Sequence, residues 1–179
     1  MSRTEQELSP RAREVVRAAR ALLESDGADA FTMRRLAERL GIRAPSLYKH
    51  FPDKETLEAA IIAEGFEESA ERFEAAVAAD RRHPLRALAA AYRAFALEHP
   101  HLYRLMTEQP LRRDLLPPGV EERSAAPLVA AAGSVDRARA VWAFAHGMTI
   151  LELNDRFPPE AELDRAWAEG IRMFERLPR

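Results

Sequence analysis

Apolar residues recur along most of the chain at the spacing of an α-helix, one every three to four positions. The clearest stripe follows Ser9, a residue type that caps helices, and Pro10, which suits a first helical turn. Its members are Ala12, Val15, Val16, Ala19, Leu22 and Leu23. No segment shows the period of two that is typical of a half-buried strand. The pattern therefore predicts an all-α fold of about nine helices.

Two short helices follow the first one, which is expected to end near Gly27. Thr32 caps the second helix, and Gly41 is placed to end it in a left-handed conformation. The third helix is predicted over Pro45–Phe51, because Pro52 breaks it. The small core between the two helices is predicted to consist of Leu36, Leu40, Ile42 and Leu47.

Six further helices are expected after this pair. Asp53 caps the fourth, and the others lie between Pro84 and Pro100, around Leu102–Met106, over Glu121–Ala132, from Val135 to about Asp155, and after Pro159 with Glu160 and Glu162 at its start. The fourth helix is expected to run to about Ala79. Apolar residues surround the helix from Val135 almost completely, which is typical of a helix that is buried on more than one side.

Composition and charge divide the chain. With 179 residues and 47% hydrophobic residues, the chain can bury one substantial core or a small module beside a larger one. We expect domains over 9–56 and 57–179. The formal net charge is -2, but residues 1–50 contain ten basic and seven acidic side chains. The first domain is therefore the candidate for an anionic partner.

Several classes of function find no support in the sequence. The absence of cysteine excludes disulfides, thiolate metal sites and a cysteine nucleophile. Glycine loops that bind phosphate, nucleophile elbows and the HExxH zinc motif are missing as well. His99 and His101, beside Glu98, are more typical of a solvated turn than of a metal site. We therefore expect neither an enzyme nor a resident metal or cofactor.

The location of the protein is predicted from the lack of targeting signals. Residues 1–6 are polar, and no apolar run approaches the roughly 18 residues that span a membrane. This composition favours a cytoplasmic protein.

The pair of short helices with a glycine in its turn fits a helix-turn-helix over about 32–51, in which the second helix enters the DNA major groove. Cations stand at the starts of the early helices, where acidic residues are normally favoured: Arg11, Arg13, Arg34, Arg35, Arg43 and Lys54. Bound phosphates would reconcile this pattern with the helix dipoles. The alternative is a solvated arginine face, since Arg81 and Arg82 also precede a helix.

The stretch from Val16 to Leu57 resembles the signature of the TetR family. The resemblance lies in Phe31–Ala37, Gly41–Ile42, Ser46–Phe51 and Lys54. It implies that phosphates are held by Thr32, Tyr48, His50 and Lys54. It also implies that base edges are approached by Arg34, Arg43, Ala44, Pro45, Ser46 and Lys49. For Tyr48 the alternative is a place in the core.

The C-terminal part resembles the Trp-His-Gly variant of the family's regulatory domain, through Trp142, His146, Gly147 and Leu151–Leu153. The resemblance implies a homodimer in which the last two long helices pair with those of a partner. The apolar helix from Val135 independently requires a second partner surface. The predicted interface residues are Val141, Ala145, Leu153, Trp167, Ile171 and Phe174. A two-fold dimer implies a palindromic operator with half-sites roughly 34–36 Å apart, or multiples of that.

The resemblance also implies a ligand cavity among the fourth to eighth helices. The candidate wall residues suit an apolar or aromatic molecule, although most of them are expected to be ordinary core: Phe66, Phe73, Tyr92, Phe95, Tyr103, Met106, Trp142, His146 and Met148. The sequence thus predicts a sequence-specific repressor that a small molecule releases from DNA. The alternatives are a helical module that binds another protein without DNA specificity, and a small enzyme.

Overall fold

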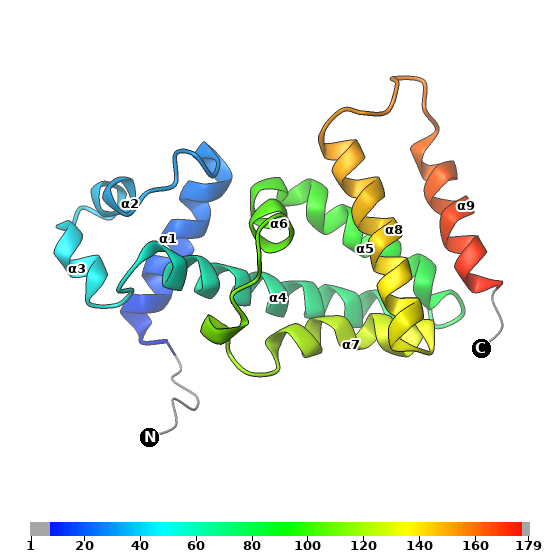
Figure 1. The fold of residues 1–179 in the computed structure, drawn as a ribbon, viewed down its shortest axis with the longest axis horizontal. Helices are drawn as coiled ribbons and strands as arrows, with labels where there is room; N and C mark the ends of the chain where they lie inside the picture. The colour runs from blue at the N-terminus through cyan, green and yellow to red at the C-terminus, as the bar shows by residue number, and fades with distance from the viewer. Residues whose placement is uncertain (1–7, 177–179) are drawn as a thin grey trace. The chain divides into compact units, whose positions relative to one another are not determined.

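The computed structural model describes residues 8–176, and within them it contains helices and no strand (Figure 1). The elements are α1 Pro10–Asp26, α2 Met33–Arg39, α3 Ala44–Tyr48, α4 Lys54–Ala79, α5 Pro84–Glu98, α6 Pro100–Thr107, the 3₁₀ turn η1 Arg113–Leu115, α7 Val120–Ala132, α8 Val135–Leu153 and α9 Leu163–Glu175. The prediction of an all-α fold with nine α-helices is confirmed over the described range.

The helices form two compact units. The first contains the described residues up to Gly65 together with His99–Val120, and the second contains Phe66–Glu98 with the described residues from Glu121 onward. The first half of α4 therefore belongs to one unit and its second half to the other. The expected boundary between residues 56 and 57 concerns function and stays a prediction. By packing, α6 and η1 belong with the N-terminal helices.

The first unit is organised around α1. Its predicted apolar stripe is buried along its whole length, and Ser9 and Gly27 lie at its two ends as expected. The Ser9 hydroxyl accepts a hydrogen bond from the backbone N–H of Ala12 at 3.2 Å, which satisfies one of the free donors of the first turn. Leu36 of α2 and Leu47 of α3 are both fully buried in this unit. α2 is therefore held by Met33, Leu36 and Ala37, and α3 by Leu47.

Two predicted helix limits are wrong by a few residues. α3 ends at Tyr48 and does not reach Phe51, because the N–H groups of His50 and Phe51 both donate to the carbonyl of Leu47 and close the chain into a turn. Pro52 also disfavours a helical conformation of the residue before it. α9 begins at Leu163, so Glu160 lies before the helix, where Ala161 donates to the carbonyl of Pro158 in a turn.

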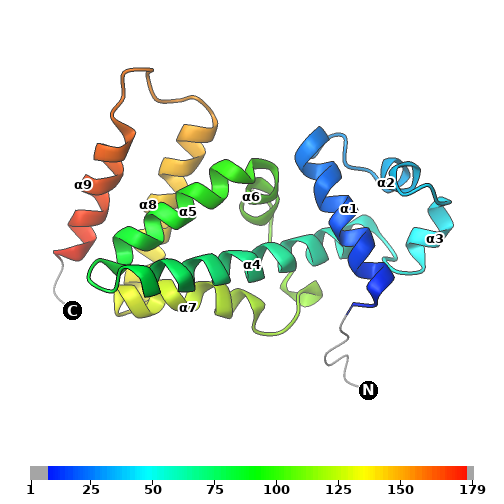
Figure 2. The ribbon, with the colours of Figure 1, turned by 180° about the vertical axis from the view of Figure 1, so that it is seen from behind.

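The second unit consists of α5, α7, α8, α9 and the second half of α4. α8 and α9 run side by side in opposite directions, and α5 packs on both (Figures 1 and 2). Their shared core is buried and apolar, and it consists of Leu85, Ala89, Ala132, Ala138, Val141, Ala145, Trp167 and Ile171. α7 is joined to α4 through a hydrogen bond of 2.9 Å between the buried hydroxyls of Ser69 and Ser124.

One ion cluster fastens the three helices of this core together. Arg93 of α5 donates to both carboxylate oxygens of Glu152 on α8, at 2.8 and 2.7 Å, and to Asp164 on α9 at 2.5 Å. Its guanidinium also stands over the ring of Trp167. The hydrogen bonds to Glu152 raise the pKa of Arg93. Because the Arg93–Glu152 pair is largely shielded from solvent, it is stronger than an ordinary surface pair.

The close approach of α8 and α9 depends on Gly170. A Cβ atom at this position would overlap with the ring of Phe144. The Phe144 ring is itself held at its sides, with centroid distances of 5.7 Å to Trp167 and 5.9 Å to Phe174. It therefore has little room to retreat from a larger residue.

Gly170→Ala is expected to destabilise the protein by about 1–3 kcal/mol through overpacking, although alanine is the better helix former. The measurement is thermal unfolding followed by circular dichroism. Gly147→Ala is the matched control, because nothing lies within 4 Å of a Cβ atom built there in α8. That variant should gain up to about 1 kcal/mol. Equal stabilisation by both substitutions would contradict the close packing described for Phe144.

Candidate DNA-binding surface and ligand pocket

The residues predicted to meet base edges lie on and around α3. Leu47 is the buried side chain of this helix, and the predicted DNA residues occupy its other sides. Ala44 and Ser46 are half-buried, and the exposed members are Arg43, Pro45, Tyr48, Lys49 and His50. Tyr48 is 49% exposed, so the alternative interpretation that placed it in the core is wrong. The structure therefore gathers these side chains on an accessible surface of the first unit.

The turn between α2 and α3 has the geometry expected from Gly41. This residue has a φ of +64°, in the left-handed region that favours glycine. Its N–H donates to the carbonyl of Glu38 at 3.1 Å, and the N–H of Ile42 donates to the carbonyl of Ala37 at 3.0 Å. These bonds satisfy the carbonyls at the end of α2 and fix the direction in which the chain enters α3.

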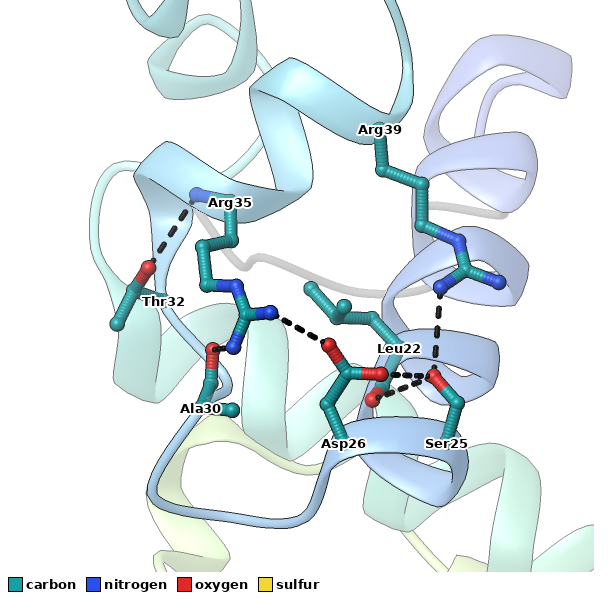
Figure 3. A network of polar contacts seen from close by, with 7 residues as sticks. All are labelled: Leu22, Ser25, Asp26, Ala30, Thr32, Arg35 and Arg39. Atoms are coloured by element: carbon teal, nitrogen blue, oxygen red, sulfur yellow. Dashed lines mark hydrogen bonds and ion pairs between the residues drawn. The ribbon is translucent and has the colours of Figure 1, made fainter.

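The three arginines of α2 make different contacts, and Figure 3 shows those of Arg35 and Arg39. Arg35 donates to Asp26 of α1 at 2.8 Å, and Arg39 donates to the hydroxyl of Ser25 at 3.3 Å. Arg34 is 88% exposed and pairs with Glu38 of its own helix at 3.0 Å. Of the two cations predicted from the start of α2, Arg35 thus holds the helix on α1, and Arg34 is the one presented to solvent.

Thr32 and Asp53 cap the helices that begin at this surface. The Thr32 hydroxyl accepts a hydrogen bond from the N–H of Arg35 at 3.2 Å, as predicted for the N-cap of α2 (Figure 3). Asp53 accepts two hydrogen bonds of 2.7 Å from Thr56, one from the backbone N–H and one from the hydroxyl. These bonds, the backbone one first, lower the pKa of Asp53 below its ordinary value of 3.8.

Lys54 is the first residue of α4. Its ammonium stands 5.3 Å from the centroid of the Phe31 ring and 3.2 Å from a carboxylate oxygen of Glu58. The side chain remains partly exposed. The phosphate contact expected of Lys54 stays a prediction.

A small apolar cavity of about 30 Å³ lies within the second unit. Three of the nine predicted wall residues line it, namely Phe73, Tyr92 and Trp142. The remaining wall consists of Leu88, Ala89, Leu128, Val141 and Ala145, which were not predicted as ligand residues. The helical spacing of Leu88, Ala89 and Tyr92, and of Val141, Trp142 and Ala145, was the signal that could have identified them.

The other predicted wall residues lie elsewhere. Tyr103 and Met106 belong to α6 in the first unit, where Met106 packs against Gly65 of α4. Phe95 is buried on α5 without lining the cavity, and Met148 packs against the core of the second unit. The ring of His146 lies 6.1 Å from that of Trp142, and Phe66 is half-buried on α4. The cavity therefore contains fewer aromatic side chains than the sequence suggested.

Four of the six residues predicted at a dimer interface are buried inside their own unit. These are Val141, Ala145, Trp167 and Ile171, which leave almost no area for a partner. Leu153 and Phe174 are half-buried. The large exposed apolar residues of α8 and α9 are instead Val135, Trp142, Leu151 and Met173. The reason for the difference is that both sides of α8 are apolar, so the pattern alone does not distinguish its core side from its outer side.

Two family models match this chain. One describes the DNA-binding part of bacterial regulatory proteins of the tetR family and matches residues 15–61, which include the helix-turn-helix. The other describes a tetracyclin repressor-like C-terminal domain and matches residues 85–174. The chain belongs to the TetR family. The Trp-His-Gly variant of the C-terminal domain stays a prediction.

Relatives of known sequence and structure agree with this membership. An uncharacterised helix-turn-helix transcriptional regulator of Mycobacterium tuberculosis is 30% identical over 149 residues, which cover 78% of this chain and 68% of the relative. A protein of unknown function from Rhodococcus has a similar structure, with a TM-score of 0.77, 25% identity, and coverage of 98% of this chain and 97% of that one. A TetR variant from Acinetobacter baumannii, solved with minocycline, has a TM-score of 0.65, 26% identity and 94% coverage of both chains.

Membership of the TetR family makes this protein a DNA-binding transcriptional regulator and not an enzyme. Over residues 8–176, no three histidine or acidic side chains gather into a group that could hold a metal ion. The ring of His101 lies against Gly27 at the end of α1. Among the helices of the described range, none is both long enough and apolar enough to cross a membrane.

The cap at Asp53 predicts a pH-dependent contribution to stability. Because folding lowers the pKa of Asp53, the contribution is fully present above the ordinary value of 3.8 and is lost as the pH falls through the lowered pKa. Asp53→Asn should therefore unfold at a lower temperature than wild type at pH 7, and the difference should shrink toward pH 2. Asp29→Asn, in the exposed turn before α2, is the control. A difference that stays constant with pH would refute the electrostatic part of this cap.

Proposed function

We propose that this TetR-family regulator is a homodimeric repressor that binds a palindromic operator in the cytoplasm and is released by a small apolar or aromatic molecule. The observation that supports the proposal best is the exposed surface around α3, which is available for the major groove. No resident metal or cofactor is needed for this activity.

Sequence readout is assigned to the exposed cations of the helix-turn-helix. Arg43, at the N-cap of α3, and Arg34, on α2, each have the planar guanidinium that binds a guanine edge through two hydrogen bonds. Lys49, Pro45, Ser46 and Ala44 approach neighbouring bases, and Ala44 can contact a thymine methyl group. Thr32, Tyr48, His50 and Lys54 bind phosphates and set the register on the duplex.

The dimer uses the sides of α8 and α9 that face away from their shared core. Leu151 of α8 and Met173 of α9 are exposed apolar residues, and Met173 is 69% exposed. A partner helix pair that covers them would bury this apolar area, as the all-round apolar pattern of α8 requires. The proposed surface therefore replaces the buried residues that the sequence suggested for the interface.

Ligand binding requires the second unit to open. Pockets that bind drug-sized molecules measure roughly 300–1,000 Å³, whereas this cavity measures about 30 Å³. The molecule must therefore displace some of the cavity wall, which comes from α4, α5, α7 and α8. The minocycline complex of the Acinetobacter relative supports a small-molecule effector for this fold.

The link between ligand and DNA is assigned to α4. This helix carries Phe73 of the cavity wall and begins with Lys54 at the DNA-binding surface. A shift of α4 on ligand binding would move Lys54 and the cap at Asp53, and the affinity for DNA would fall. Linkage demands that operator DNA lower the affinity for the ligand by the same factor, typically about 5–150-fold.

The purified protein is used to select bound fragments from genomic DNA. These fragments should share a palindromic site. Arg43→Ala should then weaken binding to that site by about 1–3 kcal/mol and relax the preference at one base pair of each half-site, because a bidentate contact is lost. Arg35→Ala should leave the base preference of the site unchanged, because Arg35 contacts Asp26 of α1 and is not assigned to a base. Recovery of no enriched site, together with binding that does not weaken with added salt, would instead favour a protein-interaction module.

Ala89→Val is expected to fill the cavity and to abolish release of the operator by apolar or aromatic compounds, while DNA affinity remains. Compounds are found by screening for release of a fluorescent operator duplex. Ala90→Val is the matched control, because Ala90 is the exposed neighbour of Ala89 on α5. Binding of a hit should change the fluorescence of Trp142, and Trp142→Phe should remove that signal. Equal ligand affinity with and without operator would exclude the coupling through α4.

A further inference from the structure

The segment between α6 and α7 folds back onto the first turn of α4. Arg112, at the N-cap of η1, forms an ion pair with Glu55 of α4. Its guanidinium is held from the other side by Asp114, which accepts hydrogen bonds from Nε at 3.0 Å and from Nη2 at 2.8 Å. All three residues belong to the first unit.

The conformation of this segment is fixed locally. The N–H of Leu115 donates to the carbonyl of Arg112 at 3.0 Å, and the N–H of Arg113 donates to that of Leu111 at 3.0 Å. Pro110 lies before these turns and Pro117 after them, and proline restricts the backbone at both positions. Arg112 is therefore presented to α4 from a short, constrained piece of chain.

The first turns of α4 are acidic apart from Lys54. Asp53 precedes this lysine, Glu55 follows it, and Glu58 pairs with it at 3.2 Å. Asp53 is held as a carboxylate by Thr56, and the charge of Arg112 adds a small further contribution that lowers its pKa. A phosphate that approaches Lys54 would thus meet several negative charges well within one Debye length, which is about 10 Å. Arg112 is a cation that the segment between α6 and α7 brings to this end of α4, where it lies between the carboxylates of Glu55 and Asp114.

We propose that Arg112 is a positioning residue for DNA binding: its ion pair with Glu55 offsets the carboxylate beside Lys54 and so lets the start of α4 approach a phosphate. The proposal rests on the DNA-binding role of the helix-turn-helix and adds to it a residue from outside that motif. Arg112 does not itself touch DNA in this arrangement. Its effect is independent of DNA sequence, because phosphates carry the same charge at every base pair.

The test is a double-mutant cycle in the full-length protein, with Arg112→Gln, Glu55→Gln and the double variant. Affinity is measured for the selected operator and for a duplex of arbitrary sequence of the same length, at low and at physiological salt. Arg112→Gln should weaken binding about threefold per head, and so roughly tenfold for a dimer on two half-sites, equally for both duplexes. Glu55→Gln should bind at least as tightly as wild type. The double variant should return to wild-type affinity.

A matched control comes from the second unit. Arg123 of α7 and Glu67 of α4 form an ion pair of similar exposure, with side chains 45% and 44% exposed against 50% and 65% for Arg112 and Glu55. Arg123→Gln should leave DNA affinity unchanged. Circular dichroism and the unfolding temperature of each variant report whether it is folded.

Two results would overturn the proposal. If the double variant binds as weakly as Arg112→Gln alone, Arg112 does not act by offsetting the carboxylate of Glu55. If Arg112→Gln has no effect on either duplex, the pair is only structural. Both results differ from a failure of the proposed function, in which the wild-type protein itself would bind neither duplex at low salt.

Discussion

The DNA-binding surface depends on the burial of two leucines. α2 and α3 have seven and five residues, and helices this short are not stable in water by themselves. Leu36 and Leu47 are fully buried in the first unit, and Arg35 and Arg39 fasten α2 to the end of α1. Because α1 and these contacts supply the stability, Pro45 and Tyr48 of α3 are free to be exposed, and Ala44 and Ser46 are only half-buried. The support and the recognition surface are thus provided by different residues of the same few turns.

Local signals explain which parts of the structure the sequence predicts well. Caps at Ser9, Thr32 and Asp53 and the turn at Gly41 depend on neighbours only a few residues away, and each was confirmed. The limits of α3 and α9 were less accurate, because turn hydrogen bonds at Leu47 and Pro158 end or delay those helices. Such turn bonds use backbone groups that a longer helix would also use. Whether the turn or the helix forms depends on the packing of residues further along the chain.

The cavity and the outer face of α8 were harder to predict for a different reason. Val141 and Ala145 face the core, whereas Leu151 is exposed on the same helix, and all three are apolar. Periodicity identifies the buried side of a helix only when the opposite side is polar, and the opposite side of α8 is apolar as well. The contacts from outside the motif, such as Arg112 with Glu55, were equally hidden, since 57 positions separate the two residues. Pairings at that distance follow from the tertiary fold and leave no local pattern.

Trp142 has one side in the cavity wall and is still half-exposed on the surface of α8. Under the proposed effector binding, a lineage that acquires a new effector would be expected to change this residue. The same replacement would alter the exposed surface of α8, one of the two helices assigned to the dimer. Duplicated copies of such a regulator would then diverge in effector and in the partner that they pair with through a single substitution.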